Sequence, residues 1–122
     1  MRFNLLSLIL DAADLESESA FWSRLVGGST AKTATHHFVQ ADGLPAIVIQ
    51  HAPGHVAPQW PDGAPQQMHF DLATSDPAAA DERVRDAGGR RLLPADDVTL
   101  AGQQGSRVYA SPAGHPFCLR SA

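Results

Sequence analysis

The two halves of this sequence carry the same markers of secondary structure at the same spacing. Asp14 precedes a helix-compatible stretch that ends at Gly27-Gly28, and Asp76 precedes another that ends at Gly88-Gly89. The two aspartates are 62 positions apart and the two glycine pairs are 61 apart. A repeated unit usually corresponds to one supersecondary structure, so a period of about 60 residues constrains the fold more strongly than composition does.

Each half predicts a strand, a helix and three further strands. Two runs before the aspartates have the period of a pleated strand: in one, Leu6, Leu8 and Leu10 alternate with Ser7 and Ile9, and in the other, Met68, Phe70 and Leu72 alternate with His69 and Asp71. The aspartates are predicted N-caps and the glycine pairs predicted helix ends. The later strands are expected at 30–33, 36–40, 46–51, 90–93, 107–110 and 117–120. The chain is therefore predicted to be α+β, with two tandem βαβββ modules.

A proline-rich linker separates the modules. We place module 1 at about residues 3–51, the linker at about 52–66 and module 2 at about 67–121 of a single domain covering residues 1–122. Pro53, Pro58, Pro61 and Pro65 exclude a helix and a central strand there. Trp60, the one large apolar side chain of the linker, either packs the linker onto the body or forms part of a pocket wall.

Composition excludes several classes of function. The chain has 9 Lys and Arg residues against 13 Asp and Glu residues, a net charge of −4, and no basic run, which argues against nucleic-acid binding. No segment approaches the roughly 20 apolar residues of a membrane span. The single cysteine, Cys118, cannot form an internal disulfide, so we expect a reducing, cytoplasmic location.

Several short sequence motifs resemble those of a known family in their order and spacing. They are ILDAAD, AFWSRLVGG and AIVIQ in the first half, and MHFDLATSD, ERVRDAGGRR and SPAGHPFCLR in the second. Together they resemble the vicinal oxygen chelate superfamily, specifically its glyoxalase-like and bleomycin-resistance-like members. The resemblance implies that the two βαβββ modules form a curved mixed sheet around a cleft. It also implies ligand positions on the first and last strands of each module, which fall on Ser7, Gln50, His69 and Cys118.

Strand alternation predicts which of these side chains share a face. If Met68, Phe70 and Leu72 face the helices, His69 and Asp71 face the other side, and the same rule places Gln50 and Cys118 there. The predicted ligand pocket is Ser7, Gln50, Trp60, His69, Asp71 and Cys118. Its amide, thiol and hydroxyl suit a hard divalent ion poorly, so no metal cofactor is expected; a metal, if bound, would use His69 and Gln50.

His69 is the candidate catalytic residue. A carboxylate such as Asp71, one strand period away, raises the pKa of an imidazole and prepares it for acid–base work. The alternative is a structural polar pair.

Three other groups of residues are interpreted as structural. Trp22 is predicted to pack in the core. His36 and His37, which point to opposite faces, are predicted to be solvated or on an edge strand. Four arginines in and after the second predicted helix are interspersed with acidic residues, and we interpret them as a solvated helix face. They are Arg83, Arg85, Arg90 and Arg91.

Two functions remain open alongside a purely structural or partner-binding role. The first is binding of a small organic molecule in the cleft, including resistance-like sequestration. The second is a lyase, isomerase or dioxygenase acting on a small carbonyl or aromatic metabolite through His69. A homodimer is expected in each case, because two modules leave sheet edges and one rim of the cleft open.

Overall fold

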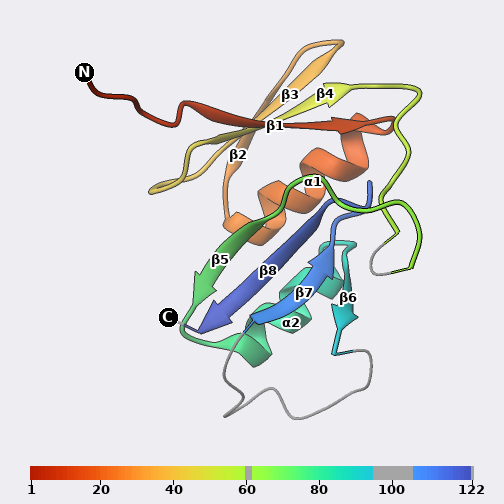
Figure 1. Ribbon diagram of the computed structural model, residues 1–122. Coiled ribbons are helices and arrows are strands. Elements are labelled where there is room, and N and C mark those ends of the chain that lie inside the picture. The colour runs from red at the N-terminus through yellow and green to blue at the C-terminus, as the bar shows by residue number, and fades with distance from the viewer. Residues whose placement is uncertain (60–61, 95–105, 122) are drawn as a thin grey trace. The chain divides into compact units, whose positions relative to one another are not determined.

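The structure is a computed structural model that describes residues 1–59, 62–94 and 106–121. The chain divides into two compact units, Met1–Val56 and Ala57–Ala122. Each unit has its own four-stranded sheet with one helix against it (Figure 1). The predicted α+β fold with two βαβββ modules is confirmed.

The first unit is built in the order β1 (Ser7–Ala12), α1 (Leu15–Val26), β2 (Ser29–Lys32), β3 (His36–Gln40) and β4 (Ala46–His51). Its sheet has the strand order β1-β4-β3-β2, with β1 parallel to β4 and the other pairs antiparallel. The core between α1 and the sheet consists of fully or nearly fully buried side chains: Phe21, Trp22, Val39, Ile47 and Ile49. The predicted core role of Trp22 is confirmed.

The helix α1 begins and ends where the sequence predicts. The Asp14 carboxylate accepts a hydrogen bond from the Ser17 amide at 3.2 Å, and Glu16 and Glu18 lie in the first turn near the positive end of the helix dipole. Gly27 ends the helix with φ of 71°, a left-handed conformation that glycine adopts without steric cost.

The second unit repeats this order with β5 (Phe70–Thr74), α2 (Pro77–Asp86), β6 (Arg90–Leu93), β7 (Ser106–Ala110) and β8 (Pro116–Ser121). The strand order is β5-β8-β7-β6, with β5 parallel to β8. Asp76 caps α2 through the Ala79 amide at 3.1 Å, and Pro77 occupies the first helical turn. Two aromatic rings, Tyr109 and Phe117, stack in the core at 5.6 Å.

A buried ionic network joins α2 to its sheet. The Asp81 carboxylate accepts hydrogen bonds from Arg85 Nε at 2.9 Å, Arg91 Nη1 at 2.9 Å and the Tyr109 hydroxyl at 2.8 Å. Burial opposes ionisation of Asp81, but these three donors outweigh it and hold the pKa of the carboxyl below its usual value. Burial, and secondly Asp81, raise the pKa of the Tyr109 phenol well above its usual range.

Four expectations about individual side chains are wrong. Leu6 and Met68 precede the strands β1 and β5 instead of lying in them, and their side chains are 85% and 71% exposed. His37 is buried in an interior strand, where its Nδ1 lies 2.7 Å from Ser19 Oγ. Arg91 is no solvated helix residue, because it lies in β6 with a side chain only 3% exposed and is ion-paired to Asp81.

The helices of the described residues are too short or too polar to cross a membrane.

Candidate functional site

The face of the second sheet that points away from α2 carries the polar residues of interest. Arg91 and Tyr109 both reach Asp81 of α2, so their side chains lie on the helix side. Because side chains alternate along a strand, Arg90 and Ala110 lie on the opposite face. The register places Ala110 beside both Arg90 and Pro116. A row of residues from three strands therefore shares the face opposite α2, which we call the open face.

His69, Asp71 and Cys118 form a cluster further along the open face. Asp71 lies beside Cys118 in the register of β5 and β8. One donor atom from each of the three residues lies within 4.8 Å of the other two, and His69 Nε2 is 3.7 Å from Asp71 Oδ1. His69 and Asp71 are partly exposed, whereas Cys118 is buried. The sequence prediction that these three residues share a face is consistent with this arrangement.

The charge of Asp71 is already balanced by Arg120. Arg120 Nε donates to Asp71 Oδ2 at 2.6 Å. This hydrogen bond, together with the charge of the guanidinium, a hydrogen bond from the Cys118 thiol and the nearby His69, lowers the pKa of the Asp71 carboxyl. Asp71 is therefore held ionised, with one oxygen committed to Arg120.

The cluster fits a divalent ion only in part. An imidazole, a carboxylate oxygen and a thiolate are zinc ligands, and the three atoms are close enough to share one ion. The Arg120 guanidinium, however, places a positive charge against the carboxylate that would have to offset the charge of the metal. The cluster thus offers three donors of which one is already ion-paired.

The other residues of the predicted pocket lie in the first unit or outside the described residues. Ser7 and Gln50 belong to the first unit, where Ser7 pairs with Ala46 and Gln50 with Asp11. Trp60 lies outside the described residues. The registers also show that Gln50 and Arg120 occupy equivalent strand positions, whereas the equivalent of Cys118 is the buried Val48. Gln50 therefore lies two residues beyond the first-unit position that is equivalent to Cys118.

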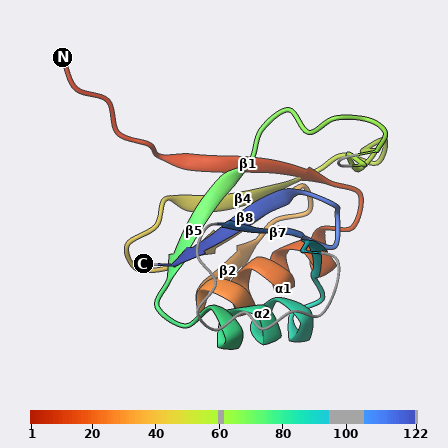
Figure 2. The ribbon, with the colours of Figure 1, turned by 60° about the horizontal axis from the view of Figure 1, so that its bottom comes forward.

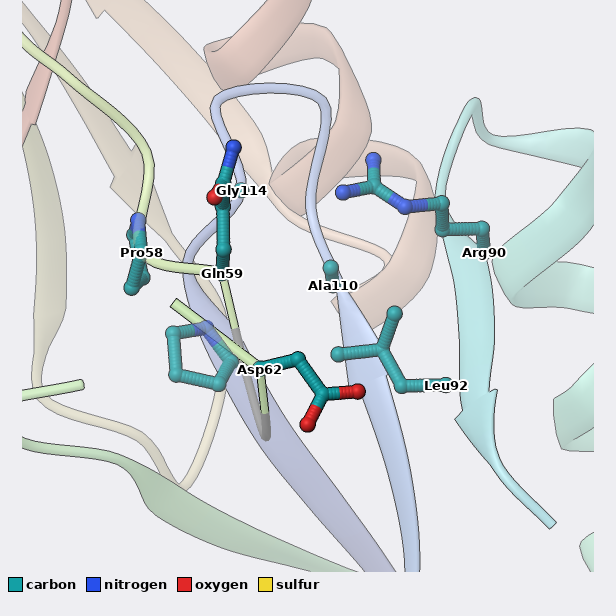
Figure 3. A pocket seen from close by; sticks show the side chains of 8 residues that line it. Pro58, Gln59, Asp62, Arg90, Leu92, Ala110 and Gly114 are labelled. Atoms are coloured by element: carbon teal, nitrogen blue, oxygen red, sulfur yellow. The ribbon is translucent and has the colours of Figure 1, made fainter. Parts of the chain in front are cut away.

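A pocket of about 330 Å³ lies on the open face, where β6 and β8 begin and β7 ends (Figure 3). One wall comes from the sheet and the turn before β8, and the other from the linker. The sheet and turn contribute Arg90, Leu92, Ala110, Gly114 and Pro116. The linker contributes Pro58, Gln59 and Asp62, so it forms part of a pocket wall.

The turn between β7 and β8 keeps the pocket wall in place. The Gly114 amide donates to the Ser111 carbonyl at 2.8 Å, and the Ser111 amide donates to the His115 carbonyl at 3.0 Å. Gly114 has φ of 88°, and a side chain there would run into Ala57 of the linker. Glycine therefore allows the linker to approach the turn and narrow the pocket.

Sequence reasoning missed Gln59, Asp62, Arg90 and Leu92. The signal for Arg90 was available, since two adjacent arginines in a strand must point to opposite faces. Only one of them can pair with the helix, which leaves the other for the open face. No periodicity fixes the linker, so Gln59 and Asp62 had no comparable signal.

A second, shallower depression lies in the first unit near the start of α1. Its lining includes Glu16, His37 and His51. The His37 ring is fixed by Ser19 through Nδ1, and its Nε2 lies 3.8 Å from Glu16 Oε1, while Lys32 holds the same carboxylate at 2.9 Å. The contacts among Glu16, Ser19, Lys32 and His37 tie α1 to β2 and β3.

The glyoxalase-like domain family matches residues 7–120. The chain belongs to this family. The match covers both βαβββ modules and nearly the whole chain, as the resemblance implied. No curated protein matches the chain.

Solved structures with the same fold have low sequence identity. The fosfomycin resistance protein FosX from Listeria monocytogenes aligns with a TM-score of 0.72 at 16% identity, over 100% of this chain and 95% of that one. A glyoxalase/bleomycin resistance protein/dioxygenase family enzyme from Burkholderia phytofirmans aligns with a TM-score of 0.72 at 12% identity, over 98% of each chain. A glyoxalase-related enzyme from Fulvimarina pelagi aligns with a TM-score of 0.69 at 19% identity, over 98% and 88%. At these identities the likeness shows the fold alone.

Proposed function

We propose that this glyoxalase-like protein binds a small organic molecule on the open face of its second sheet and sequesters it without a catalytic metal. The pocket between the linker and β6–β8 is the observation that carries the proposal. Its volume of about 330 Å³ is at the lower end of the range of ligand sites. Its lining combines apolar side chains with a few polar groups, which is the usual composition of a small-molecule site.

The His69 cluster supports binding without metal catalysis. The Asp71 carboxylate is neutralised by Arg120 at 2.6 Å, and Cys118 is buried beside it. A ligand on the open face would meet a charge-balanced surface there, with His69 as the accessible hydrogen-bonding group.

Titration of the full chain with a library of metabolites and antibiotics tests this proposal. We expect compounds of small volume to bind with dissociation constants at or below the millimolar range. The backbone amide resonances of Leu92, Ala110 and Gly114 should shift in nuclear magnetic resonance (NMR) spectra. Uniform absence of binding at millimolar concentration, measured by calorimetry and by NMR, would refute the proposal.

A second candidate function is an enzyme acting on a small carbonyl or aromatic metabolite. The observation in its favour is that His69, Asp71 and Cys118 place donor atoms within 4.8 Å of one another. His69 would then act as an acid–base group or as a metal ligand. Stoichiometric zinc, nickel, manganese or iron in protein purified without chelator, lost in His69→Ala, would favour this function over sequestration.

We also propose that the protein is a cytoplasmic homodimer. β1 is at the edge of its sheet and carries Ile9, which is 58% exposed. The segment before β1 extends away from the sheet in both views (Figures 1 and 2) and exposes Phe3, Leu5 and Leu6. Apolar residues beside an unpaired edge strand are typical of a surface that a second copy covers. Sedimentation at twice the chain mass of 13.0 kDa would support the dimer, and sedimentation at 13.0 kDa at micromolar concentration would refute it.

A further inference from the structure

Two charged side chains on the pocket wall have no partner among the described residues. Arg90 and Asp62 both line the pocket, and neither makes an ion pair or hydrogen bond with any group in the described part of the chain, including each other. The arginines nearby behave differently, since Arg85, Arg91 and Arg120 each pair with a carboxylate at 2.6–2.9 Å. Both charges on this pocket wall are therefore left uncompensated by the described part of the chain.

The two charges enter the pocket from different walls. Arg90 comes from β6 and Asp62 from the linker (Figure 3). The Asp62 carboxylate points toward Leu92, and the Arg90 guanidinium points away from β6 toward the turn that contains Gly114. The lining also includes the apolar residues Leu92, Ala110 and Pro116. The wall thus presents a cation, an apolar floor and an anion.

We infer that this pocket selects a compact zwitterion, with its anionic group toward Arg90 and its ammonium group toward Asp62. This inference rests on the proposed binding function and specifies the chemical class of the ligand. A ligand with only an anionic group would pair with Arg90 but bring a like charge to Asp62, and a purely cationic ligand would do the reverse. Each of these ligands would leave one protein charge partly desolvated and unpaired, which disfavours its binding.

The size of the pocket limits the ligand to about that of an amino acid. A volume of about 330 Å³ admits one ring or branched chain on the apolar floor together with its two charged groups. Arg90 and Asp62 are both exposed, so each ion pair is screened by water and salt. Charge selectivity should therefore be modest and should weaken as salt is added.

Three matched compounds test the inference on the full chain. L-Phenylalanine carries both charges, 3-phenylpropionate only the negative one and 2-phenylethylamine only the positive one. By NMR titration at low ionic strength we expect L-phenylalanine to bind about two- to fivefold more tightly than either analogue. The difference should shrink in about 0.5 M salt, where the Debye length falls to a few ångströms.

Two variants assign the charges separately. Arg90→Gln should remove the advantage of L-phenylalanine over 2-phenylethylamine, because the carboxylate then has no cation to meet. Asp62→Asn should remove its advantage over 3-phenylpropionate. Arg83→Gln and Glu82→Gln, which change charge on α2 without touching the pocket, should leave all three affinities unchanged.

Two results would overturn the inference. Equal affinity for the three compounds, or failure of L-phenylalanine to bind at millimolar concentration, would show that the pocket does not select a zwitterion. If uncharged library compounds still shift the resonances of Leu92 and Ala110, the binding function stands and only the ligand class is wrong. If no compound of any charge shifts them, the proposed function fails as well.

Discussion

The ionic network under α2 should be among the most sensitive points of the second unit. Asp81→Ala removes the carboxylate that accepts from Arg91, whose side chain is 3% exposed, and from the fully buried Tyr109. Arg91 Nη1 and the Tyr109 hydroxyl then both lose this acceptor in a nearly buried site, although Arg91 Nε still donates to the Pro94 carbonyl at 2.9 Å. Removing one partner of a buried charge pair costs about 3–5 kcal/mol. The contact to the half-exposed Arg85 adds less than about 1 kcal/mol because solvent screens it.

This cost is a large fraction of the stability of a domain, which is typically about 5–15 kcal/mol. Urea denaturation followed by far-ultraviolet circular dichroism measures the loss directly as a change in the free energy of unfolding. Glu82→Ala is the matched control, because it removes an exposed carboxylate from the next position of the same helix. We expect that control to change stability by less than about 0.5 kcal/mol.

A milder variant keeps the test informative if Asp81→Ala does not fold. Tyr109→Phe removes one hydrogen bond to an ionised group and should cost about 1.5–3 kcal/mol. If Asp81→Ala lowers the free energy of unfolding by less than about 1 kcal/mol, the network is not desolvated. The reasoning that Arg91 is anchored on α2 and leaves Arg90 for the open face would then lose its support.

Three further predictions concern titration, the first unit and metal. Hydrogen bonds lower the pKa of Asp81 in the folded state, so its contribution to stability is present above the unfolded pKa of about 3.9 and is lost as pH falls through the folded value. Thermal unfolding between about pH 2 and 6 should therefore show a shallower pH dependence for Asp81→Asn than for the native chain. Equal slopes for the two proteins would contradict this. Ser19→Ala leaves His37 without its 2.7 Å partner and should cost about 1–3 kcal/mol in urea denaturation. The control Ser17→Ala keeps the backbone amide that Asp14 caps and removes only an exposed hydroxyl 3.4 Å from the Asp14 carbonyl, so it should cost less than about 0.5 kcal/mol. Treatment with a chelator should leave ligand affinity unchanged if sequestration needs no metal, and a tenfold or greater loss, reversed by added zinc, would favour the enzymatic alternative.

The fold could be predicted from the sequence because its signals are local and occur twice. Asp14 and Asp76 cap their helices, and three of the predicted strands, 36–40, 46–51 and 90–93, have the observed bounds. The starts of β1 and β5 were placed too early, since Leu6 and Met68 continue the apolar alternation without being paired in a sheet. Periodicity predicts the face of a residue but not whether a neighbouring strand extends far enough to pair with it.

The site could be predicted only where strand geometry determines it. Alternation brought His69, Asp71 and Cys118 to one face, and the structure places their donor atoms within 4.8 Å. The ion pair between Asp71 and Arg120 was not foreseen, because it joins residues 49 positions apart across a parallel register. The pocket residues Gln59 and Asp62 lie in a linker whose course depends on packing against the turn at Gly114.

The proposed binding of a small molecule on the open face of the second sheet can be tested residue by residue. The most direct measurement is an amide-resolved NMR titration of the full chain with compounds that bind by calorimetry. We expect the largest shifts on Arg90, Leu92, Ala110 and Gly114, and we expect Arg90→Gln to weaken binding while Arg83→Gln does not. Shifts confined to α2 or to the first unit, with affinity unchanged in Arg90→Gln, would contradict it.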